Sequence, residues 1–318
     1  MPQPQTSILT VTLNPALDLS AGTATVHPGP KLRCDTPRYD PGGGGINISR
    51  AIGALGGDSA ALVALGGATG AQLADLLLRD GVVAKPLPAP GDTRLSLSIT
   101  AEDTRAQYRF VLPGPHWPAP AVEAAVAAIV AAAPAGGFVA ISGSQPPGFP
   151  ENAIARISSA LPGATRLVAD TSGAPLKALA AGQGARLFCV RMDAEEAESL
   201  ANRPLPRRED SADFAQSLVQ RGVAENVIIA RGPDGSVMVT EAGRWFCPAP
   251  TVPVISKIGA GDSFVAGFVL ALARGQSVQA ALGLGVAAAS AAVMTPATEL
   301  CRRSDTEALA KVCVVEPI

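Results

Sequence analysis

Residues 256–268 read Ser-Lys-Ile-Gly-Ala-Gly-Asp-Ser-Phe-Val-Ala-Gly-Phe, a small-residue turn that leads directly into an apolar helix. In a turn formed by Gly259, Ala260 and Gly261, successive backbone N–H groups can point at one spot, and the helix dipole adds positive potential there. Such a spot favours an anion. Asp262 stands at its edge, where a carboxylate can accept a proton from a hydroxyl while the N–H groups stabilise developing negative charge. Taken alone, Asp262 is equally well explained as the N-cap of the helix.

A second glycine-rich segment, residues 41–47, reads Pro-Gly-Gly-Gly-Gly-Ile-Asn and opens a predicted helix over residues 46–55. Four successive glycines cost backbone entropy, and they are typical of positions that a ligand or another backbone approaches closely. The segment lacks GxxxxGK[ST], and no GxGxxG follows a strand, so neither a P-loop nor a dinucleotide fingerprint is supported. A flexible turn is the alternative explanation.

Composition excludes several classes of function. The 318 residues, of which 47% are hydrophobic, suffice for one large core. A net charge of −2, with only 16% charged residues, provides no basic surface for nucleic acid. The five cysteines are widely spaced without a CxxC pair, which argues against a disulfide framework or a zinc site. No apolar run is long enough for a membrane span and no signal-peptide pattern is present, so we expect a cytoplasmic protein without a membrane partner.

Apolar strand-like runs alternate with helical patterns along most of the chain. Strands are predicted at residues 8–13, 60–65, 138–141, 166–169 and 227–230, and helices at residues 71–79, 122–133, 151–161, 211–221 and 262–274. This alternation is typical of an α/β fold with a mainly parallel sheet and helices on both faces. Residues 20–40 and 94–112 break the pattern. The second of these segments alternates apolar and polar side chains, as a half-buried antiparallel hairpin does.

The two glycine motifs together resemble the signatures of the ribokinase (PfkB-type) carbohydrate kinases, and the closer match is to the phosphofructokinase members of that family. Further matching segments are residues 12–18, 31–34, 66–70, 108–111, 141–148 and 285–292, so the likeness extends from about residue 8 to about residue 301. The resemblance implies a single ribokinase-like kinase domain over residues 1–318. Segments 20–40 and 94–112 would then form a small β-lid over the sugar site, clasping the lid of a second subunit in a homodimer. An ordinary edge hairpin is the alternative for residues 94–112.

The activity that the resemblance implies is ATP- and Mg²⁺-dependent phosphorylation of a sugar phosphate. Fructose 6-phosphate is the expected acceptor, and fructose 1,6-bisphosphate the product. One alternative is a kinase for fructose 1-phosphate, tagatose 6-phosphate or an unphosphorylated sugar, and another is a weakly active sugar-phosphate sensor of the same fold. Phosphoryl transfer needs an in-line hydroxyl, charge neutralisation on the phosphates and a nearby base. The resemblance assigns Asp262 as the base, with Gly259, Ala260 and Gly261 as the anion hole.

Positions on the substrate side match those that hold the sugar and its phosphate in the family. They are Asp18, Lys31, Arg33, Gly43, Gly44, Asn47, Arg94 and Ser144. An unphosphorylated sugar would have no use for three cations, whereas a phosphate is well held by an arginine fork and a lysine point charge. Each cation alone would be explained as a solvated surface charge, but their coincidence on matched positions favours a sugar phosphate.

Positions on the nucleotide side match the family less closely. The residues expected near ATP are Arg191, Asp193, Arg231, Gly232, Gly235, Val286 and Ser290. For the helix that carries Val286 and Ser290, a tight helix–helix contact is an equally good explanation. Where the family has Lys-Pro-Asn-x-x-Glu, residues 191–196 read Arg-Met-Asp-Ala-Glu-Glu, so an aspartate replaces the asparagine. Its added charge changes the local field. Asp170, Asp193 and Glu196 nevertheless carry oxygens that can orient a hydrated Mg²⁺.

Potassium dependence is doubtful for this chain. In the family, a monovalent cation is held between the loop before the Gly-Ala-Gly-Asp turn and a loop that corresponds to residues 292–299. Here Lys257 occupies a position where threonine is usual, and Glu299 one where arginine is usual, after Thr295, Pro296 and Ala297. We expect a Lys257–Glu299 ion pair to replace the cation. The alternative is that both side chains face solvent, where such a pair contributes little.

Overall fold

The computed structural model describes residues 4–182, 184–296 and 298–318. Residues 1–3 of the N-terminal segment, and Ala297 of the loop considered for potassium, lie outside the described residues. None of the helices within the described part of the chain combines the length and the apolar character needed to cross a membrane.

A ten-stranded sheet runs through the larger part of the molecule, in the order β14-β13-β12-β11-β10-β9-β8-β1-β4-β5. Its strands are β1 (Ile8–Thr12), β4 (Ala60–Leu65), β5 (Val83–Pro88), β8 (Phe138–Ser142), β9 (Arg166–Asp170), β10 (Leu187–Asp193), β11 (Ala224–Ala230), β12 (Ser236–Thr240), β13 (Gly243–Cys247) and β14 (Glu316–Pro317). The strands from β5 to β11 are parallel. Strands β12, β13 and β14 extend one edge in antiparallel pairing, and the sequence analysis did not predict them.

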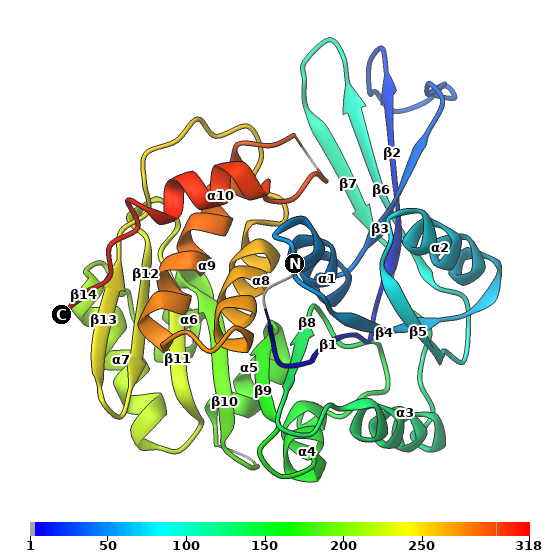
Figure 1. Ribbon diagram of the computed structural model, residues 1–318. Coiled ribbons are helices and arrows are strands. Elements are labelled where there is room, and N and C mark those ends of the chain that lie inside the picture. Colours follow the sequence, from blue (N-terminus) through cyan, green and yellow to red (C-terminus); the bar gives the residue numbers. More distant parts are fainter. Residues whose placement is uncertain (1–3, 183, 297) are drawn as a thin grey trace.

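Helices cover both faces of this sheet (Figure 1). One layer contains α1 (Gly44–Ala54), α8 (Ala260–Ala273) and α9 (Val278–Val293), with α10 (Arg303–Ala310) against α9. The other layer contains α3 (Ala119–Ala132), α4 (Ala153–Ala160), α5 (Gly173–Ala180), α6 (Ala194–Ala201) and α7 (Arg208–Gln220). Helix α2 (Gly67–Arg79) packs near β4 and β5, and a short 3₁₀ turn, η1 (Gly232–Asp234), follows β11. The predicted α/β architecture is confirmed.

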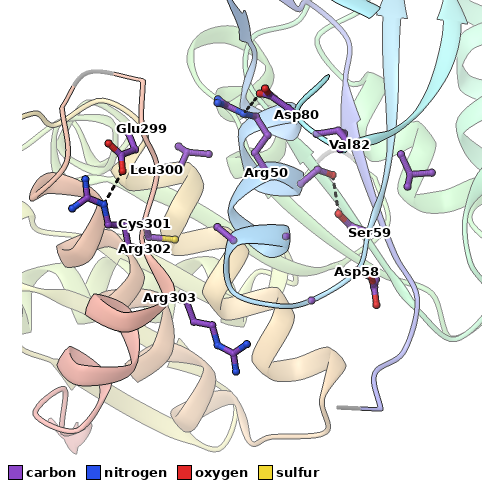
Figure 2. A pocket seen from close by; sticks show the side chains of 16 residues that line it. Arg50, Asp58, Ser59, Asp80, Val82, Glu299, Leu300, Cys301, Arg302 and Arg303 are labelled. Atoms are coloured by element: carbon purple, nitrogen blue, oxygen red, sulfur yellow. Dashed lines mark hydrogen bonds and ion pairs between the residues drawn. The ribbon is translucent and has the colours of Figure 1, made fainter. Parts of the chain in front are cut away.

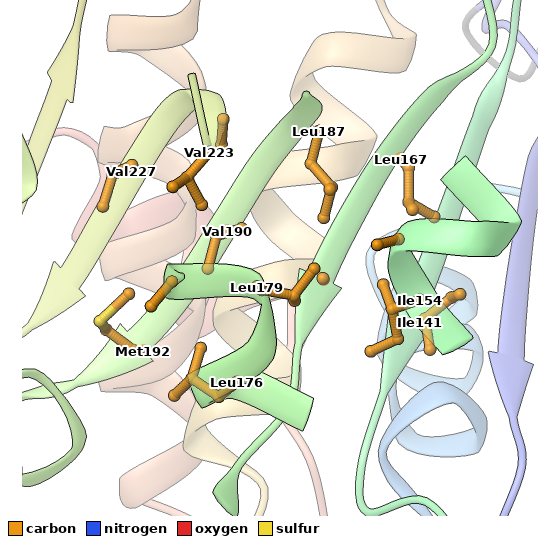
Figure 3. Packing of buried hydrophobic residues seen from close by; sticks show 14 of the residues in the cluster. Ile141, Ile154, Leu167, Leu176, Leu179, Leu187, Val190, Met192, Val223 and Val227 are labelled. Carbon is orange, nitrogen blue, oxygen red and sulfur yellow. The ribbon is translucent and has the colours of Figure 1, made fainter. Parts of the chain in front are cut away.

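The central strands are rich in apolar residues because both faces of the sheet are buried there. In β9, Leu167 and Ala169 belong to the core on the α3–α7 side, whereas Val168 belongs to the core under α1, α8 and α9. Figure 3 shows the first of these cores, where Leu176 and Leu179 of α5 pack over the central strands. The two cores hold the carboxyl ends of β8, β9 and β10 side by side, which is where the candidate site lies.

A second, four-stranded sheet stands beside the main one, in the order β3-β2-β6-β7 (Figure 1). It consists of β2 (Ala16–Thr23), β3 (Arg38–Gly42), β6 (Arg94–Ala101) and β7 (Gln107–Val111), and we call it the lid. Strands β6 and β7 pair in antiparallel fashion, with Leu97 opposite Phe110, as the alternation in residues 94–112 predicts. The other lid segment begins earlier than expected, because β2 starts at Ala16 and pairs along its length with β6.

Candidate active site

The turn before α8 has the geometry of an anion-binding helix start. Helix α8 begins at Ala260, and its N-cap is Gly259, whose φ of 75° lies in the left-handed region that glycine adopts readily. Asp262 therefore lies within the first turn, and the alternative that it is the N-cap is wrong. The first N–H groups of a helix lack partners within the helix, and the dipole adds positive potential beside them. Ala260 and Gly261 line a cavity at this end of the helix.

Two side chains from distant parts of the sequence hold the Asp262 carboxylate. Asn47 Nδ2 in α1 donates to Asp262 Oδ2 at 3.0 Å, and Ser142 Oγ at the end of β8 donates to Asp262 Oδ1 at 3.2 Å. Burial raises the pKa of Asp262 from 3.8 to about 6, and the nearby Asp170 carboxylate adds to this rise, although both hydrogen bonds and the charge of Arg191 oppose it. A carboxylate with this pKa is ionised at neutral pH and basic enough to accept a proton from a hydroxyl.

Arg191 places a fixed positive charge beside the turn. Its Nη1 lies 3.1 Å from Asp170 Oδ1, and both side chains are only 14% exposed. Burial works against the charge of Arg191, but the carboxylates of Asp170, Asp262 and Glu196 together raise its pKa. The guanidinium packs so closely against Gly261 that a Cβ there would lie 3.0 Å from Arg191 Nη1. Its Nε is buried without a hydrogen-bond partner in the described part of the chain.

A cavity of about 380 Å³ extends from this turn between α8, α9 and the ends of β10 to β12. Five of the residues predicted near the nucleotide line it, namely Arg191, Gly232, Gly235, Val286 and Ser290. The sequence analysis missed the opposite wall, which comes from the segment 249–254 and from Phe264. The available signal was the proline-rich apolar run immediately before the Gly-Ala-Gly-Asp turn.

The structure does not bring the Arg231 side chain into this cavity. Arg231 donates instead to the backbone oxygen of Leu205 at 2.9 Å, that of Pro206 at 2.8 Å and Ser211 Oγ at 2.6 Å. These bonds anchor the loop that precedes α7. Arg231 therefore supports the neighbouring Gly232 loop, while the glycine backbone itself faces the cavity.

Asp18 lies at the base of the lid, among the other predicted sugar-binding residues. Burial raises the pKa of Asp18, and the charges of Arg94 and Arg109 and a hydrogen bond from Ser96 oppose the rise. Arg94 Nε donates to the backbone oxygen of Asn14 at 3.2 Å. The Asn14 side chain in turn donates to Ser144 Oγ at 3.1 Å. Asp18, Arg94 and Ser144 therefore share one region, and Asn14, Ser96 and Arg109 are neighbours that the sequence analysis did not single out.

Glycines are needed at the start of α1 because other parts of the chain approach this loop closely. Gly43 has a φ of 133°, and a Cβ on Gly44 would collide with the Ser142 side chain. A Cβ on Gly42 would likewise collide with the Asp18 carboxylate. The alternative of a merely flexible turn is therefore wrong, because side chains at these positions would displace residues of the candidate site.

Lys31 and Arg33 are not gathered with Arg94 in the single chain. Both are exposed, and they lie in residues 24–37, which connect β2 to β3 at the outer end of the lid (Figure 1). The predicted phosphate clamp of three cations is therefore only partly assembled within one chain.

Comparison with known proteins identifies the family. Residues 12–305 match the pfkB family of carbohydrate kinases. The chain belongs to this family. ATP-dependent 6-phosphofructokinase isozyme 2 of Mycobacterium tuberculosis is 37% identical over 302 residues, which cover 94% of this chain and 88% of the relative. The Escherichia coli protein of the same name is 38% identical over 305 residues, covering 94% and 96%. A 1-phosphofructokinase of Xanthomonas campestris is 32% identical over 266 residues, covering 83% of each chain.

Solved structures support the same assignment. Phosphofructokinase-2 from Escherichia coli in complex with potassium matches with a TM-score of 0.89 at 35% identity, covering 97% of this chain and 99% of that chain. The same protein in complex with fructose-6-phosphate matches with a TM-score of 0.87, and its tetrameric inhibited form with 0.89. The predicted ribokinase-like fold is thereby confirmed, and the chain is a PfkB carbohydrate kinase, an ATP-dependent class of enzyme.

The ion pair predicted to replace potassium is not formed. Glu299 pairs with Arg302 at 2.7 Å, and Lys257 takes part in no ion pair among residues 4–182, 184–296 and 298–318. Lys257 instead lines the nucleotide-side cavity. The two loops are joined by backbone bonds, since Ile255 N–H and Ser256 N–H both donate to the backbone oxygen of Val293, at 2.8 and 3.2 Å. The prediction failed because Arg302, three residues from Glu299, is the nearer partner.

The carboxylates predicted near Mg²⁺ are largely engaged with the protein. Asp170 pairs with Arg191. Asp193 Oδ1 accepts from Glu196 N–H at 2.8 Å, and Glu196 Oε2 accepts from Asp193 N–H at 2.9 Å, which forms a capping box at the start of α6. Within the described residues, no group of three or more His, Cys, Asp or Glu side chains is placed to bind a metal ion directly. The structure therefore shows these carboxylates engaged with Arg191 and with the start of α6.

Proposed function

We propose that this chain is an ATP-dependent kinase that phosphorylates fructose 6-phosphate at its 1-hydroxyl, giving fructose 1,6-bisphosphate. One observation carries the proposal. The Asp262 carboxylate lies at an anion-binding helix start, next to a cavity on one side and to the residues at the base of the lid on the other. The relatives from Mycobacterium tuberculosis and Escherichia coli bear the name of this activity, and the second has been solved with fructose-6-phosphate.

In the proposed reaction, ionised Asp262 accepts the proton of the sugar hydroxyl. The hydroxyl oxygen forms a bond to the γ-phosphorus of ATP while the bond from that phosphorus to the β–γ bridging oxygen breaks, which releases ADP. The N–H groups of Gly259, Ala260 and Gly261 and the guanidinium of Arg191 stabilise negative charge on the transferring group. The pKa of about 6 for Asp262 keeps the base ionised at neutral pH.

The proposed sugar site lies at the base of the lid. Asp18 and Asn47 hold sugar hydroxyls, Gly43 and Gly44 let the sugar approach the backbone, and Arg94 and Ser144 hold the phosphate. Lys31 and Arg33 complete the phosphate site when the lid packs against the lid of a second chain. The exposed outer strand supports this homodimer, because Tyr108 and Phe110 share one face of β7 and remain 38% and 55% exposed among the described residues.

ATP is proposed to occupy the 380 Å³ cavity, with the base near Val286 and Ser290 and the phosphates towards Gly261 and Arg191. The buried, unpartnered Nε of Arg191 fits a ligand that brings hydrogen-bond acceptors. Asp170, Asp193 and Glu196 are proposed to hold Mg²⁺ through water, and the ion would neutralise charge on the ATP phosphates. Gly232 and Gly235 shape the cavity, whereas Arg231 acts through the loop that it anchors.

Fructose 1-phosphate is the second candidate acceptor, since a relative that is 32% identical is named 1-phosphofructokinase. The same lid residues would then meet a phosphate at the opposite end of the sugar. The sensor alternative is disfavoured by the intact turn and by the two hydrogen bonds that hold Asp262.

ADP release across a panel of acceptors tests the proposal. The panel contains fructose 6-phosphate, fructose 1-phosphate, tagatose 6-phosphate, fructose, ribose and no sugar, each with MgATP. The expected result is that fructose 6-phosphate has the highest kcat/KM. A higher kcat/KM for fructose 1-phosphate would make that sugar the acceptor. If no sugar increases ADP release, the result would favour the sensor alternative.

A further inference from the structure

The Asp262 carboxylate is held on both of its oxygens by residues that do not line the nucleotide cavity. Ser142, which is only 5% exposed, donates to one oxygen from the end of β8. Asn47 donates to the other oxygen from α1. The glycine at position 44 leaves room for the Ser142 hydroxyl, because a Cβ there would collide with it. A carboxylate has about four lone-pair sites, so both contacts leave it able to accept a proton.

Arg50, one helical turn further along α1, supports the same orientation of the Asn47 amide that the Asp262 carboxylate requires. Arg50 Nη1 lies 3.5 Å from Asn47 Oδ1. A guanidinium can only donate hydrogen bonds, so the atom of Asn47 that faces Arg50 must be the carbonyl oxygen. The amide nitrogen then faces Asp262. With the amide reversed, a carbonyl oxygen would face the carboxylate and the hydrogen bond to the base would be lost.

Arg50 is itself anchored away from the reacting groups. Its Nε lies 2.9 Å from Asp80 Oδ2, and its side chain is 19% exposed. Figure 2 shows Arg50 reaching from α1 to Asp80 in the wall of a second cavity. This cavity, of about 620 Å³, lies between α1 and the segments 57–59, 80–83 and 299–303. Arg50 therefore affects the base only through Asn47.

We propose that Ser142 and Arg50 are positioning residues for phosphoryl transfer. Ser142 holds one oxygen of Asp262 directly, and Arg50 holds the other through the Asn47 amide. Together they fix the carboxylate plane, so that a free lone pair faces the hydroxyl of the sugar. This inference rests on the proposed role of Asp262 as the base, and it adds two residues that lie outside the lining of the nucleotide-side cavity.

The expected effect falls on turnover. Ser142→Ala removes one hydrogen bond to a charged group, so we expect kcat to fall about tenfold or more, with both KM values changed less than about twofold. Arg50→Met frees the Asn47 amide, and we expect a smaller loss of about three- to tenfold, since the amide can still find its orientation part of the time. Arg50→Lys retains a donor and should recover much of the lost turnover.

Steady-state kinetics of these variants test the inference, with Arg302→Met as the matched control. Arg302 lines the same 620 Å³ cavity as Arg50 but pairs with Glu299, at 2.7 Å, and not with Asn47. Its replacement should therefore leave kcat unchanged. The decisive measurement is Ser142→Ala combined with Asp262→Asn. If Ser142 acts through the base, the double variant should be no slower than Asp262→Asn alone, because residues that act as a unit are not additive.

Two outcomes would overturn the inference. Ser142→Ala could lower kcat by the same factor in the Asp262→Asn background as in the wild type, or Ser142→Ala and Arg50→Met could both retain full turnover. Thermal unfolding of each variant separates loss of folding from loss of positioning, and Arg50→Lys serves if Arg50→Met does not fold. Near-normal turnover of Asp262→Asn alone would instead contradict the proposed function.

Discussion

The surroundings of Asp262 and the outer face of the lid differ in how many of their contacts a single chain provides. Around Asp262, a single chain supplies Asn47, Ser142 and Arg191 from three separate elements. On the lid, all of β7 is exposed, and the Phe110 side chain remains 55% exposed among the described residues. In the proposed function, the chemistry would be built into the core of each subunit, whereas capture of the sugar phosphate would depend on a surface that a second chain completes.

The largest effect is expected for a substitution of Asp262 itself. Asp262→Asn removes the base but keeps the size of the side chain, so kcat should fall by about 10²–10⁴-fold, the range for a positioned general base. The sugar KM should change little. Steady-state kinetics with both substrates measure this, and turnover close to that of the wild type would show that another group accepts the proton.

The raised pKa of Asp262 also predicts how the stability of the same variant, compared with that of the wild type, depends on pH. Burial raises this pKa from 3.8 to about 6, so the ionised group destabilises the folded state above pH 6 and has no such effect below pH 3.8. The free energy of unfolding of Asp262→Asn, relative to the wild type, should therefore rise by up to about 3 kcal/mol between low pH and pH 7. Denaturant unfolding of both proteins at pH 4, 5, 6 and 7 measures the difference. A gain that does not grow with pH would contradict the assigned pKa.

At the base of the lid, Arg94→Ala should weaken binding of the phosphorylated sugar. A charge-assisted contact contributes about 1.5–3 kcal/mol, so KM for the sugar phosphate should rise about tenfold or more. KM for an unphosphorylated sugar provides the internal control, because Arg94 also donates to Asn14 and Leu112. Equal losses on both kinds of sugar would indicate that Arg94 supports the lid and does not bind phosphate.

At the outer face of the lid, Phe110→Lys should convert a dimer into a monomer. Phe110 is 55% exposed and lies opposite Leu97 in the β6–β7 pair, so a charge there would disrupt packing against a second lid without unfolding the sheet. Sedimentation of the wild type and the variant measures the effect, and activity should fall with dissociation. A wild-type protein that sediments as a monomer would show that the lid does not need a second chain.

The smallest effect is expected for potassium. Backbone bonds from Ile255 and Ser256 to Val293 already join the two loops that would enclose the ion. Thr295 Oγ1 lies 2.7 Å from the backbone oxygens of both Ala292 and Glu299, and its single hydroxyl proton is donated to one of them at a time. We expect initial rates in sodium and potassium, at matched ionic strength, to agree within about twofold, since the two loops are already joined without an ion. Several-fold activation by potassium would show that the loops form an intact cation site.

Sequence patterns predicted the elements that local chemistry determines. The Gly-Ala-Gly-Asp turn predicted a helix start at residue 262, and α8 begins two residues earlier, at Ala260, after a left-handed Gly259. Strands such as β8 were recognisable because burial on both faces gives them a nearly continuous apolar run. Alternation identified the β6–β7 hairpin, whereas short antiparallel edge strands such as β14 left too few residues for a pattern.

Contacts between distant segments were beyond the sequence patterns. Ser142 lies 120 residues from Asp262, and its role emerges only where the end of β8 meets α8. Arg231 was expected near the nucleotide, but two backbone oxygens in the loop before α7 and the Ser211 hydroxyl within α7 bind its guanidinium. Glu299 was expected to pair with Lys257, but Arg302, three residues away, forms the pair. In each case the outcome depends on which partner lies nearer in the folded chain.

The most direct test of the whole account is the identity of the product. The purified chain is incubated with fructose 6-phosphate and MgATP, and the reaction is followed by ³¹P NMR. The account predicts that each ATP consumed gives one ADP and one fructose 1,6-bisphosphate, visible as a new phosphomonoester on carbon 1 beside the original one on carbon 6. ATP turnover without a second sugar phosphomonoester, or no reaction with this sugar while another is phosphorylated, would contradict it.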